Sequence, residues 1–426
     1  MSYIPIDRSL QYMDGTQRVL DEETTLRNTK PHLKEIGVTR IASITDLDRI
    51  GIPVFSAIRP SAAEGAISIY SGKGSTESQA RISAMMESFE RCLAERVGVN
   101  ADIVEDVVAE EFVESVENAA KDYELLDPHS LLLPELLPLE SLVEWTQGWD
   151  LLREKEIYVP SNAVYHPYDS PGMSARLFRS NTNGLASGNV IEEAILHGLL
   201  EVIERDALSI AEFNRNPGRE IILTEEDGTN YELMKKFASN GVQLKLWLLP
   251  HDTGITSVVA ATDDLDLKDP ALLVMGAGSH LKPEIAIRRA ITEAAQSRVV
   301  QIHGAREDTD RESFVRQIGY ERMKRMNNFW YDGAVTITTG QLNDISRSTP
   351  AENIDAVLDE LRKITDSAIV VDLSRKSVGV PVVRVIVPGF EQYTLDRERV
   401  GYRVRQGRKQ SASAEKPWKR RFGKRK

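Results

Sequence analysis

The 426-residue chain alternates between short apolar runs and longer stretches in which apolar residues recur every three or four positions. β-Branched runs interrupted by Pro and Gly predict strands within residues 39–70 and at 157–164, and further apolar runs predict three strands between residues 242 and 279. One more helix and two strands are expected between residues 350 and 391. Because strands and helices alternate in clusters, the predicted fold class is α/β (α+β) with mixed sheets.

Long helices are predicted at residues 76–97, 190–213 and 283–304, and a short helix is predicted before Pro31. The second long helix, IEEAILHGLLEVIERDALSI, is apolar almost all round, which is typical of a buried helix. The segment 101–125 is acidic and amphipathic, so we expect a surface helix there. Irregular chain rich in Leu and Pro is expected after it.

The three long helices share one spacing of small and acidic residues. In each helix an alanine is followed seven residues later by a glutamate, and three residues after that by Glu or Gln. These positions are Glu87 and Glu90, Glu201 and Glu204, and Glu293 and Gln296. The small residues three positions before the first glutamate are Ala84, Gly198 and Ala290. Residues three, four or seven positions apart share a helix face, so each helix is predicted to carry a face of small residues that ends in acids.

We expect these acids to be buried together, and Glu193 and His197 extend the acidic face of the second helix. Carboxylates that converge in a buried space repel each other and lose hydration, so they require protons or cations. Oxygen ligands suit Mg²⁺, whose other ligands are often phosphates and waters. Arg91, Arg205 and Arg289 lie near the acids in sequence, and arginine binds phosphate well. The pattern predicts a site for a magnesium-bound nucleoside triphosphate, whereas one ExxER copy alone would indicate only surface ion pairs.

Several other functional classes are not supported by the motifs. GKGS at residues 72–75 resembles the end of a phosphate loop, but Ile67 stands where that loop requires glycine. GAG at 276–278 lacks the third glycine of a dinucleotide fingerprint, and the sequence contains no HExxH. A carboxylate-bridged di-metal redox protein would need Glu-x-x-His pairs, which the three helices lack. A pure binding module would not need so many buried acids.

Composition narrows the location and redox chemistry. The single cysteine, Cys92, excludes an internal disulfide framework and a thiolate-rich metal site, and we expect an inert buried thiol, with sulfur transfer as the alternative. No signal peptide or membrane-spanning apolar run is found, so a cytoplasmic protein is predicted. The net charge is −12, yet the last 26 residues hold eleven Lys and Arg against one acid. Such a tail is expected to be disordered, and it serves either solubility or contact with an acidic partner or RNA.

Three segments carry a resemblance to a known family. SGKGSTESQARISAMMESFER, SNTNGLASGNVIEEAILHGLLEVIERDA and PEIAIRRAITEAAQSR resemble signature segments of the YcaO superfamily, and the resemblance extends over about residues 15–390 to the closing VVRVIVPGFE. It implies a YcaO fold, ATP and Mg²⁺ as cofactors, and phosphorylation of a peptide amide oxygen. The implied regions are an N-terminal segment with strands at 1–70, an ATP-binding core at 71–310, the rest of the YcaO domain at 311–400, and a basic tail at 401–426.

The resemblance also implies residue roles. The implied metal and phosphate cluster consists of Glu87, Glu90, Glu193, Glu201, Glu204 and Glu293, and catalysis is assigned to Glu87, Glu201, Glu204 and Arg205. Further contacts to the nucleotide or its phosphates are expected from Arg91, Asn189 and Arg289. In the N-terminal segment, Arg18 and Thr25 occupy the positions of a basic and a hydroxyl residue that bind nucleotide, although the family often has Lys and Ser there. His197 remains open between a proton shuttle and a core histidine.

The ends of the chain favour one branch of the family. Many azoline-forming cyclodehydratases resemble each other in a proline-rich carboxyl terminus, whereas this chain ends in KRRFGKRK and shows no fused leader-binding domain. QRVLDEETTLRN resembles the group of archaeal methanogens that forms thioglycine in the alpha subunit of methyl-coenzyme M reductase, using sulfide and often a TfuA-type sulfur-delivery partner. We therefore expect ATP-dependent thioamidation by a homodimer. An azoline-forming cyclodehydratase and an accessory protein for another modifying enzyme are the alternatives.

Overall fold

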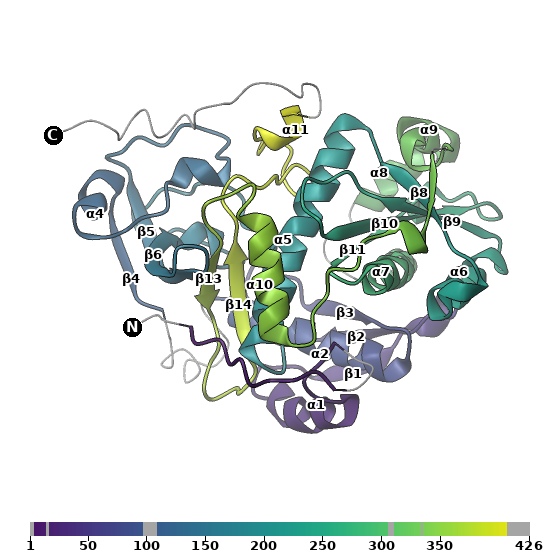
Figure 1. The fold of residues 1–426 in the computed structure, drawn as a ribbon, viewed down its shortest axis with the longest axis horizontal. Helices are drawn as coiled ribbons and strands as arrows, with labels where there is room; N and C mark the ends of the chain where they lie inside the picture. Colours follow the sequence, from purple (N-terminus) through teal and green to yellow (C-terminus); the bar gives the residue numbers. More distant parts are fainter. Residues whose placement is uncertain (1–3, 14–16, 97–108, 306–310, 334, 407–426) are drawn as a thin grey trace.

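The computed structural model describes residues 4–13, 17–96, 109–305, 311–333 and 335–406. These residues form three sheets, and each sheet is covered by one of the three long helices (Figure 1). The predicted α/β class is confirmed; two of the sheets are antiparallel, and the third is mixed. In the described part of the chain, no helix combines the length and apolar character needed to cross a bilayer.

The first unit contains the N-terminal helix and a small antiparallel sheet. Its strands are β1 (Arg40–Ser43), β2 (Val54–Ile58) and β3 (Ile69–Lys73), in the order β1-β2-β3. α2 (Glu77–Leu93) packs on β2 and β3, and α1 (Glu22–Thr29) packs on α2. The Thr76 hydroxyl accepts a hydrogen bond from the Gln79 amide at 3.2 Å. This cap starts α2 directly after β3, which fixes where the acids of α2 fall.

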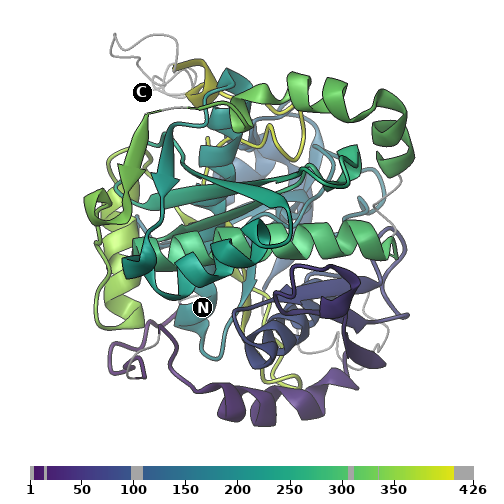
Figure 2. The same ribbon diagram turned by 90° about the vertical axis from the view of Figure 1, so that its right-hand side faces the viewer.

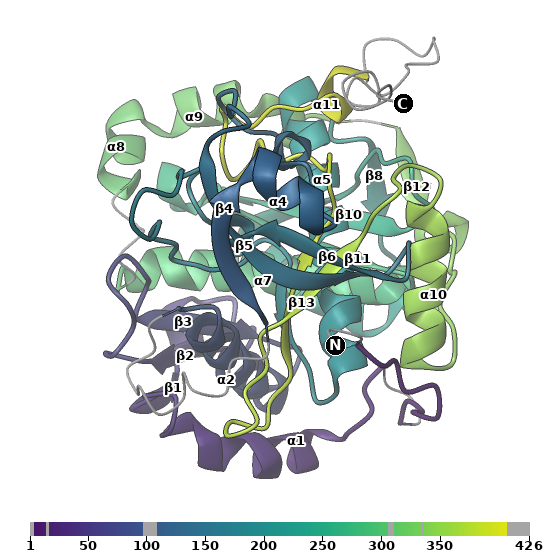
Figure 3. The same ribbon diagram turned by 90° about the vertical axis from the view of Figure 1, so that its left-hand side faces the viewer.

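The second unit is a six-stranded antiparallel sheet (Figure 3). Its strands are β4 (Glu111–Ser115), β5 (Leu142–Asp150), β6 (Lys155–Pro160), β7 (Leu185–Ser187), β13 (Ile369–Asp372) and β14 (Val382–Ile386). The order is β4-β5-β13-β14-β7, and β6 pairs with β5. α5 (Ile191–Asn214) covers β14 and β7, and α10 (Pro350–Leu361) packs on α5. A buried helix such as α5 is what its nearly continuous apolar sequence requires.

The third unit is a five-stranded sheet with the order β11-β10-β9-β8-β12. The strands are β8 (Arg219–Ile222), β9 (Val242–Leu248), β10 (Thr256–Asp264), β11 (Met275–His280) and β12 (Thr336–Thr338). The helices are α6 (Thr229–Ala238), α7 (Pro283–His303), α8 (Arg311–Ile318) and α9 (Tyr320–Met326). α7 covers β10 and β11, and Figure 2 shows this unit, in teal and green, above the purple first unit.

Small residues bring each long helix onto its sheet. A Cβ added to Gly72 of β3 would lie 2.0 Å from the amide nitrogen of Ala84, and one added to Gly276 of β11 would lie 2.1 Å from that of Ala294. On α5 the small residue is in the helix, since a Cβ on Gly198 would lie 2.6 Å from Val385 Cγ2. The predicted faces of small residues therefore pack against strands.

The long helices also connect the three units in a ring. α2 contacts β7 of the second unit, α5 contacts β10 and β11 of the third, and α7 contacts β3 of the first. Side chains on each helix can therefore meet residues of a neighbouring unit.

The structure corrects several predicted elements. Residues 101–108 of the predicted surface helix lie outside the described residues, and the rest of that segment contains β4 and α4 (Val116–Asp122). β5 begins inside chain that was expected to be irregular, because its pairing with β4, β6 and β13 outweighs a weak local pattern. The basic tail is ordered at its start, where α11 (Arg403–Gln406) packs on α5. Residues 407–426 lie outside the described part.

Candidate active site

Five of the predicted acids lie close enough to affect one another electrostatically. They are Glu87 and Glu90 of α2, Glu201 and Glu204 of α5, and Glu293 of α7. The charges of Glu87 and Glu201 both raise the pKa of Glu90, in addition to burial. Burial likewise raises the pKa of Glu204, and the charge of Glu293 raises it further. The structure thus brings acids from the three long helices into one cluster, which we call the acidic cluster.

The acids of α5 are placed where a negative charge is costly. Glu204 is 2% exposed, and its Oε2 has no hydrogen-bond partner among the described residues. The nearest cation to Glu204 is Arg205, whose Nη2 lies 3.6 Å from Oε1. Burial raises the pKa of Glu201 to about 7, although Arg205 opposes this shift. A buried carboxylate with an unused oxygen is suited to binding a cation.

The acids of α2 are held by two different partners. Arg91 Nη2 lies 2.7 Å from Glu87 Oε1, one turn along the helix. Glu90 Oε1 accepts hydrogen bonds from the amide nitrogen (3.0 Å) and hydroxyl (2.7 Å) of Ser187. Because Ser187 ends β7, the second unit orients an acid of the first.

Glu193 binds the N-terminal segment. Its Oε1 accepts from the Val19 amide at 2.7 Å, and its Oε2 accepts from the backbone (3.0 Å) and side-chain (3.1 Å) nitrogens of Asn189. Arg18 Nη1 lies 3.8 Å from the same Oε2. Glu193 thus contacts both Arg18 and Asn189, and the metal-ligand role that the resemblance implies stays a prediction.

Glu293 connects α7 with β3. It forms an ion pair with Lys73, and its Oε1 lies 4.0 Å from Arg205 Nη2. Burial alone would raise the pKa of Glu293, but the charges of Lys73 and Arg205 more than offset it, so the pKa is lowered. Glu293 is therefore a carboxylate with two cations beside it.

Basic side chains lie beside the acidic cluster, and we call Arg18, Lys73 and Arg289 the basic group. Burial lowers the pKa of His197 well below its ordinary value, and the charges of these three residues lower it further. This histidine is therefore neutral. Its Nε2 accepts from Arg289 Nη2 at 3.3 Å. The Arg289 Nε is buried without a hydrogen-bond partner among the described residues. A neutral histidine that positions an arginine favours the core role of His197 over a proton shuttle.

Two predicted positions donate hydrogen bonds to backbone carbonyls. Thr25 is buried, and its hydroxyl donates to the Asp21 carbonyl at 2.8 Å, so its role in binding nucleotide stays a prediction. Gln296, which takes the place of a third glutamate, donates instead to the Ser71 carbonyl of β3. Cys92 is 6% exposed, as expected for a buried thiol, and burial raises its pKa to about 11.

Three residues at or near the site were not predicted from the sequence, namely Lys73, Ser187 and Arg384. Lys73 was considered only as part of a phosphate loop, and its partner Glu293 is 220 residues away. Ser187 precedes the glycine of SGN without any periodic signal. Arg384 is 3% exposed on β14, and burial lowers its pKa to about 9 although the charge of Glu201 opposes the shift. A charged residue inside an apolar strand, as in VVRVIV, is the signal that could have identified Arg384.

The arrangement fits a magnesium-bound triphosphate. Among the described residues, no three His, Cys, Asp or Glu side chains are placed to hold a metal ion by themselves. Mg²⁺ commonly takes one or two carboxylates and completes its ligands with phosphate oxygens and waters. The unused oxygen of Glu204 and the unpaired Nε of Arg289 offer one group for the cation and one for a phosphate.

Relatives of known sequence support this assignment. A family model described as YcaO cyclodehydratase, ATP- and Mg²⁺-binding, matches residues 71–391. An uncharacterized protein of Methanothermobacter thermautotrophicus is 52% identical over 384 residues, which cover 89% of this chain and 97% of that protein. An uncharacterized protein in the tfuA 3′ region of Rhizobium leguminosarum bv. trifolii is 31% identical, with 89% of each chain covered.

Solved structures show the same fold. YcaO from Methanopyrus kandleri, bound with AMPPCP and Mg²⁺, matches with a TM-score of 0.73 at 30% identity, over 90% of this chain and 95% of that one. A heterocyclase in complex with substrate and cofactor matches with a TM-score of 0.75 at 21% identity, over 88% of this chain and 53% of that one. The chain therefore belongs to the YcaO family of ATP-dependent, Mg²⁺-binding, amide-activating enzymes.

Proposed function

We propose that this protein replaces the amide oxygen of a glycine in a protein substrate with sulfur, at the expense of ATP. The observation that carries the proposal is the acidic cluster of α2, α5 and α7 beside the basic group of Arg18, Lys73 and Arg289. This pairing of opposite charges is suited to Mg²⁺ and a triphosphate. Membership of the YcaO family supports amide activation as the use of that triphosphate.

Each set of residues would have a distinct task. The Mg²⁺ ligands would come from Glu87, Glu90, Glu193, Glu201, Glu204 and Glu293. The phosphate and nucleotide contacts would come from Arg18, Lys73, Arg91, Asn189, Arg205 and Arg289. Glu193 would also keep Arg18 and Asn189 in place through the hydrogen bonds and ion pair described above.

When bound, ATP supplies the phosphoryl group that turns the amide oxygen into a leaving group, while Mg²⁺ offsets the charge on the phosphates. In total, the amide, hydrosulfide and ATP give the thioamide, ADP and inorganic phosphate. The amide oxygen and the hydrosulfide proton both leave with the phosphate. The chain's arginines and Lys73 would hold the transferring group in line with the amide oxygen, which is mainly electrostatic catalysis.

We propose a glycine of the methyl-coenzyme M reductase alpha subunit as the substrate, because the N-terminal segment resembles the archaeal members with that activity. Glycine lacks a side-chain nucleophile, so the sulfur must come from outside the substrate. A TfuA-type partner is proposed as its source, since one relative is named for the tfuA region. We also propose that the protein forms a homodimer and acts in the cytoplasm. Cys92 is not proposed as a sulfur carrier, because a buried thiol of raised pKa stays protonated.

The mass of a glycine-containing substrate peptide after incubation with ATP, Mg²⁺ and sulfide tests the proposal. Exchange of oxygen for sulfur adds about 16 Da, whereas cyclodehydration, the reaction named in the family description, removes about 18 Da. We expect the gain, and only when ATP is present. A loss of mass on a peptide with Cys, Ser or Thr would instead favour the azoline-forming alternative.

Glu204→Gln tests the role of the acidic cluster, because it removes the charge of one carboxylate at nearly constant volume. We expect ATP turnover and the mass gain to be lost together, while the far-ultraviolet circular dichroism of the variant stays that of the wild type. The exposed Glu117→Gln on α4 makes the same chemical change away from the site and should leave both activities intact.

A further inference from the structure

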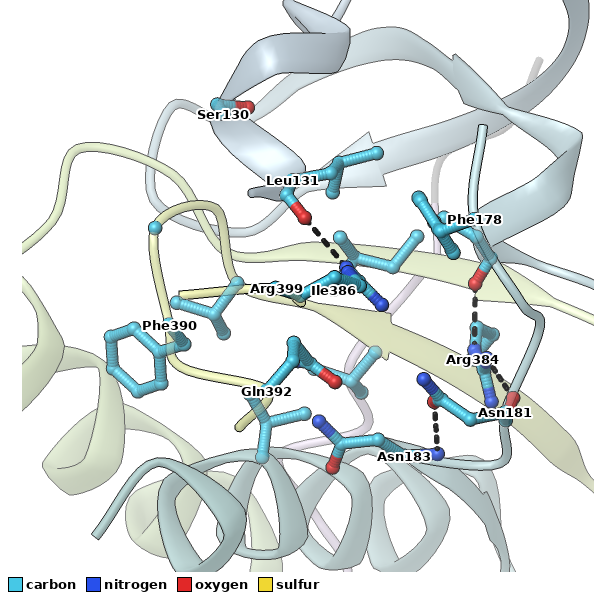
Figure 4. A pocket seen from close by; sticks show the side chains of 15 residues that line it. Ser130, Leu131, Phe178, Asn181, Asn183, Arg384, Ile386, Phe390, Gln392 and Arg399 are labelled. Atoms are coloured by element: carbon cyan, nitrogen blue, oxygen red, sulfur yellow. Dashed lines mark hydrogen bonds between the residues drawn. The ribbon is translucent and has the colours of Figure 1, made fainter. Parts of the chain in front are cut away.

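A polar pocket lies beside β14 and α5, which contribute Arg384 and Val202 to its lining (Figure 4). Its polar lining consists mainly of Asn181, Asn183, Arg384, Gln392 and Arg399. Apolar side chains such as Phe178 and Ile386 complete the walls. The pocket is separate from the acidic cluster, but Arg384 connects the two, because it interacts electrostatically with Glu201.

The two arginines of the pocket are buried without a carboxylate partner. Arg384 is 3% exposed and Arg399 is 4% exposed, and neither forms an ion pair among the described residues. Their hydrogen bonds go to backbone carbonyls, from Arg384 Nε to Ala163 at 2.8 Å and from Arg399 Nη2 to Leu131 at 2.6 Å. The Arg399 guanidinium also stacks on Phe178, with Cζ 3.8 Å from the ring centroid. The charges of Glu201 and Asp396 act on Arg384 and Arg399, respectively, but neither carboxylate forms an ion pair with its arginine.

Polar atoms without partners mark the same place. In the part of the chain that the structure describes, Arg384 Nη1, Asn183 Oδ1 and Gln392 Oε1 are buried and make no hydrogen bond. Of these atoms, Arg384 Nη1 is a donor that an anion can engage, whereas the two amide oxygens are acceptors and require a ligand that also carries a hydrogen-bond donor. Burial lowers the pKa of Arg384 to about 9 and that of Arg399 to about 10, as expected for guanidinium groups that lack an anion.

We propose that this pocket binds a small monovalent anion and that, if the thioamidation proposed above is correct, the anion is hydrosulfide. A weakly hydrated, polarisable anion suits a site with two guanidinium groups and apolar walls, because little hydration is lost on entry. Arg384 lines this pocket, and its pKa also responds to the charge of Glu201 in the acidic cluster. The pocket would therefore hold the nucleophile beside the place where the amide is activated.

Gln392→Glu is the decisive variant, because it puts a carboxylate opposite the arginines at nearly constant volume. This carboxylate would take the place of the anion. Crystals of the full chain soaked in sodium bromide, an anion of similar size, should show an anomalous peak beside Arg384 Nη1 in the wild type and none in Gln392→Glu. The KM for sulfide should rise about tenfold more than the KM for ATP in this variant. Gln147→Glu on β5 is the matched control and should change neither constant.

The outcomes separate this proposal from the proposed function. Absence of bromide from the wild-type pocket, or an unchanged KM for sulfide in Gln392→Glu, would overturn the anion site while thioamidation could still be observed. If bromide binds in the pocket but the enzyme only removes water from its substrate, the assignment of the anion to hydrosulfide would be overturned. Since the wild-type crystals test the site alone, the proposal remains falsifiable even if Gln392→Glu does not fold.

Discussion

Lys73 shows how one residue can join two parts of the site. It comes from β3, forms an ion pair with Glu293 of α7, and contributes to the positive potential around His197. A lysine between a carboxylate and a basic group is placed to bind a phosphate oxygen as a point charge. The residue therefore belongs to the site by position, although its sequence motif is not that of a phosphate loop.

Replacing Lys73 with Met is expected to weaken binding of Mg-ATP about tenfold, because one charge-assisted contact to phosphate is lost. Isothermal titration calorimetry gives the Kd directly. Lys235→Met removes a lysine from an exposed pair with Glu232 on α6 and should have no effect. Equal Kd values for both variants would exclude Lys73 from the nucleotide site.

The stability of the metal-free protein should depend on pH through Glu201. The pKa of this carboxyl is raised by burial from 4.5 to about 7 in the folded state. The folded protein therefore binds the proton more tightly than the unfolded chain does. The resulting stabilisation is complete below the unfolded pKa and is lost as the pH rises through about 7.

In EDTA-treated protein, we expect the Tm to fall as the pH rises across this window, and Glu201→Gln to flatten part of that slope. Burial also raises the pKa of Glu90 and Glu204, so some slope will remain. Differential scanning calorimetry at a series of pH values measures it, with Glu117→Gln as the control. A slope in Glu201→Gln as steep as that of the wild type would show that Glu201 does not titrate as described.

At the level of elements, the helices that carry the acids depend on close packing against strands. Gly276 of β11 has no room for a side chain, since an added Cβ would lie 2.1 Å from the Ala294 amide nitrogen and 2.3 Å from the Ala290 carbonyl oxygen. Both neighbours are backbone atoms of α7 and cannot rotate away. The position of Glu293 is thereby tied to the fit of α7 on β11.

Gly276→Ala is expected to reduce the free energy of unfolding by about 1–3 kcal/mol, because α7 must move away from β11. Urea denaturation measures this change. Gly340→Ala, at a position where nothing lies within 4 Å of the added Cβ, should change stability by less than about 0.5 kcal/mol. A Gly276→Ala variant as stable as the wild type would contradict the close fit.

These elements also show what the sequence could predict. The long helices and the strands beside them are predictable because periodic apolar positions continue over many residues, and the shared spacing of acids identified five members of the cluster. β7 is only three residues long, and β5 depends on partners far along the chain. Lys73 and Ser187 join the site through contacts between units, and Arg384 is linked to it by the charge of Glu201, far along the chain; local patterns do not report such relations. The hydrogen bond from the Val19 amide of the N-terminal segment to Glu193 was not predicted for the same reason.

At the scale of the whole molecule, buried charges link the first and third units. Arg298 of α7 is fully buried, and its Nε lies 2.9 Å from Asp48 while its Nη2 lies 3.0 Å from Asp264 of β10. Asp48 comes from the loop between β1 and β2. Since the acidic cluster takes residues from both units, this network supports the geometry of the site from a distance.

Arg298→Met is expected to cost about 3–5 kcal/mol of unfolding free energy, because two buried carboxylates lose a partner. Chemical denaturation with guanidinium chloride measures the loss. Arg362→Met breaks an exposed pair with Asp359 and should cost less than about 1 kcal/mol. Similar small losses in both variants would show that the buried network does not stabilise the contact between the units.

The central claim is that acids from three helices bind divalent cations together with a triphosphate. Anomalous diffraction from crystals grown with Mn²⁺ in place of Mg²⁺ and a non-hydrolysable ATP analogue tests it most directly. The account predicts manganese peaks within coordination distance of carboxylates from at least two of α2, α5 and α7, with phosphate oxygens as further ligands. Manganese and nucleotide bound elsewhere, with Glu201, Glu204 and Glu293 free of metal, would contradict it.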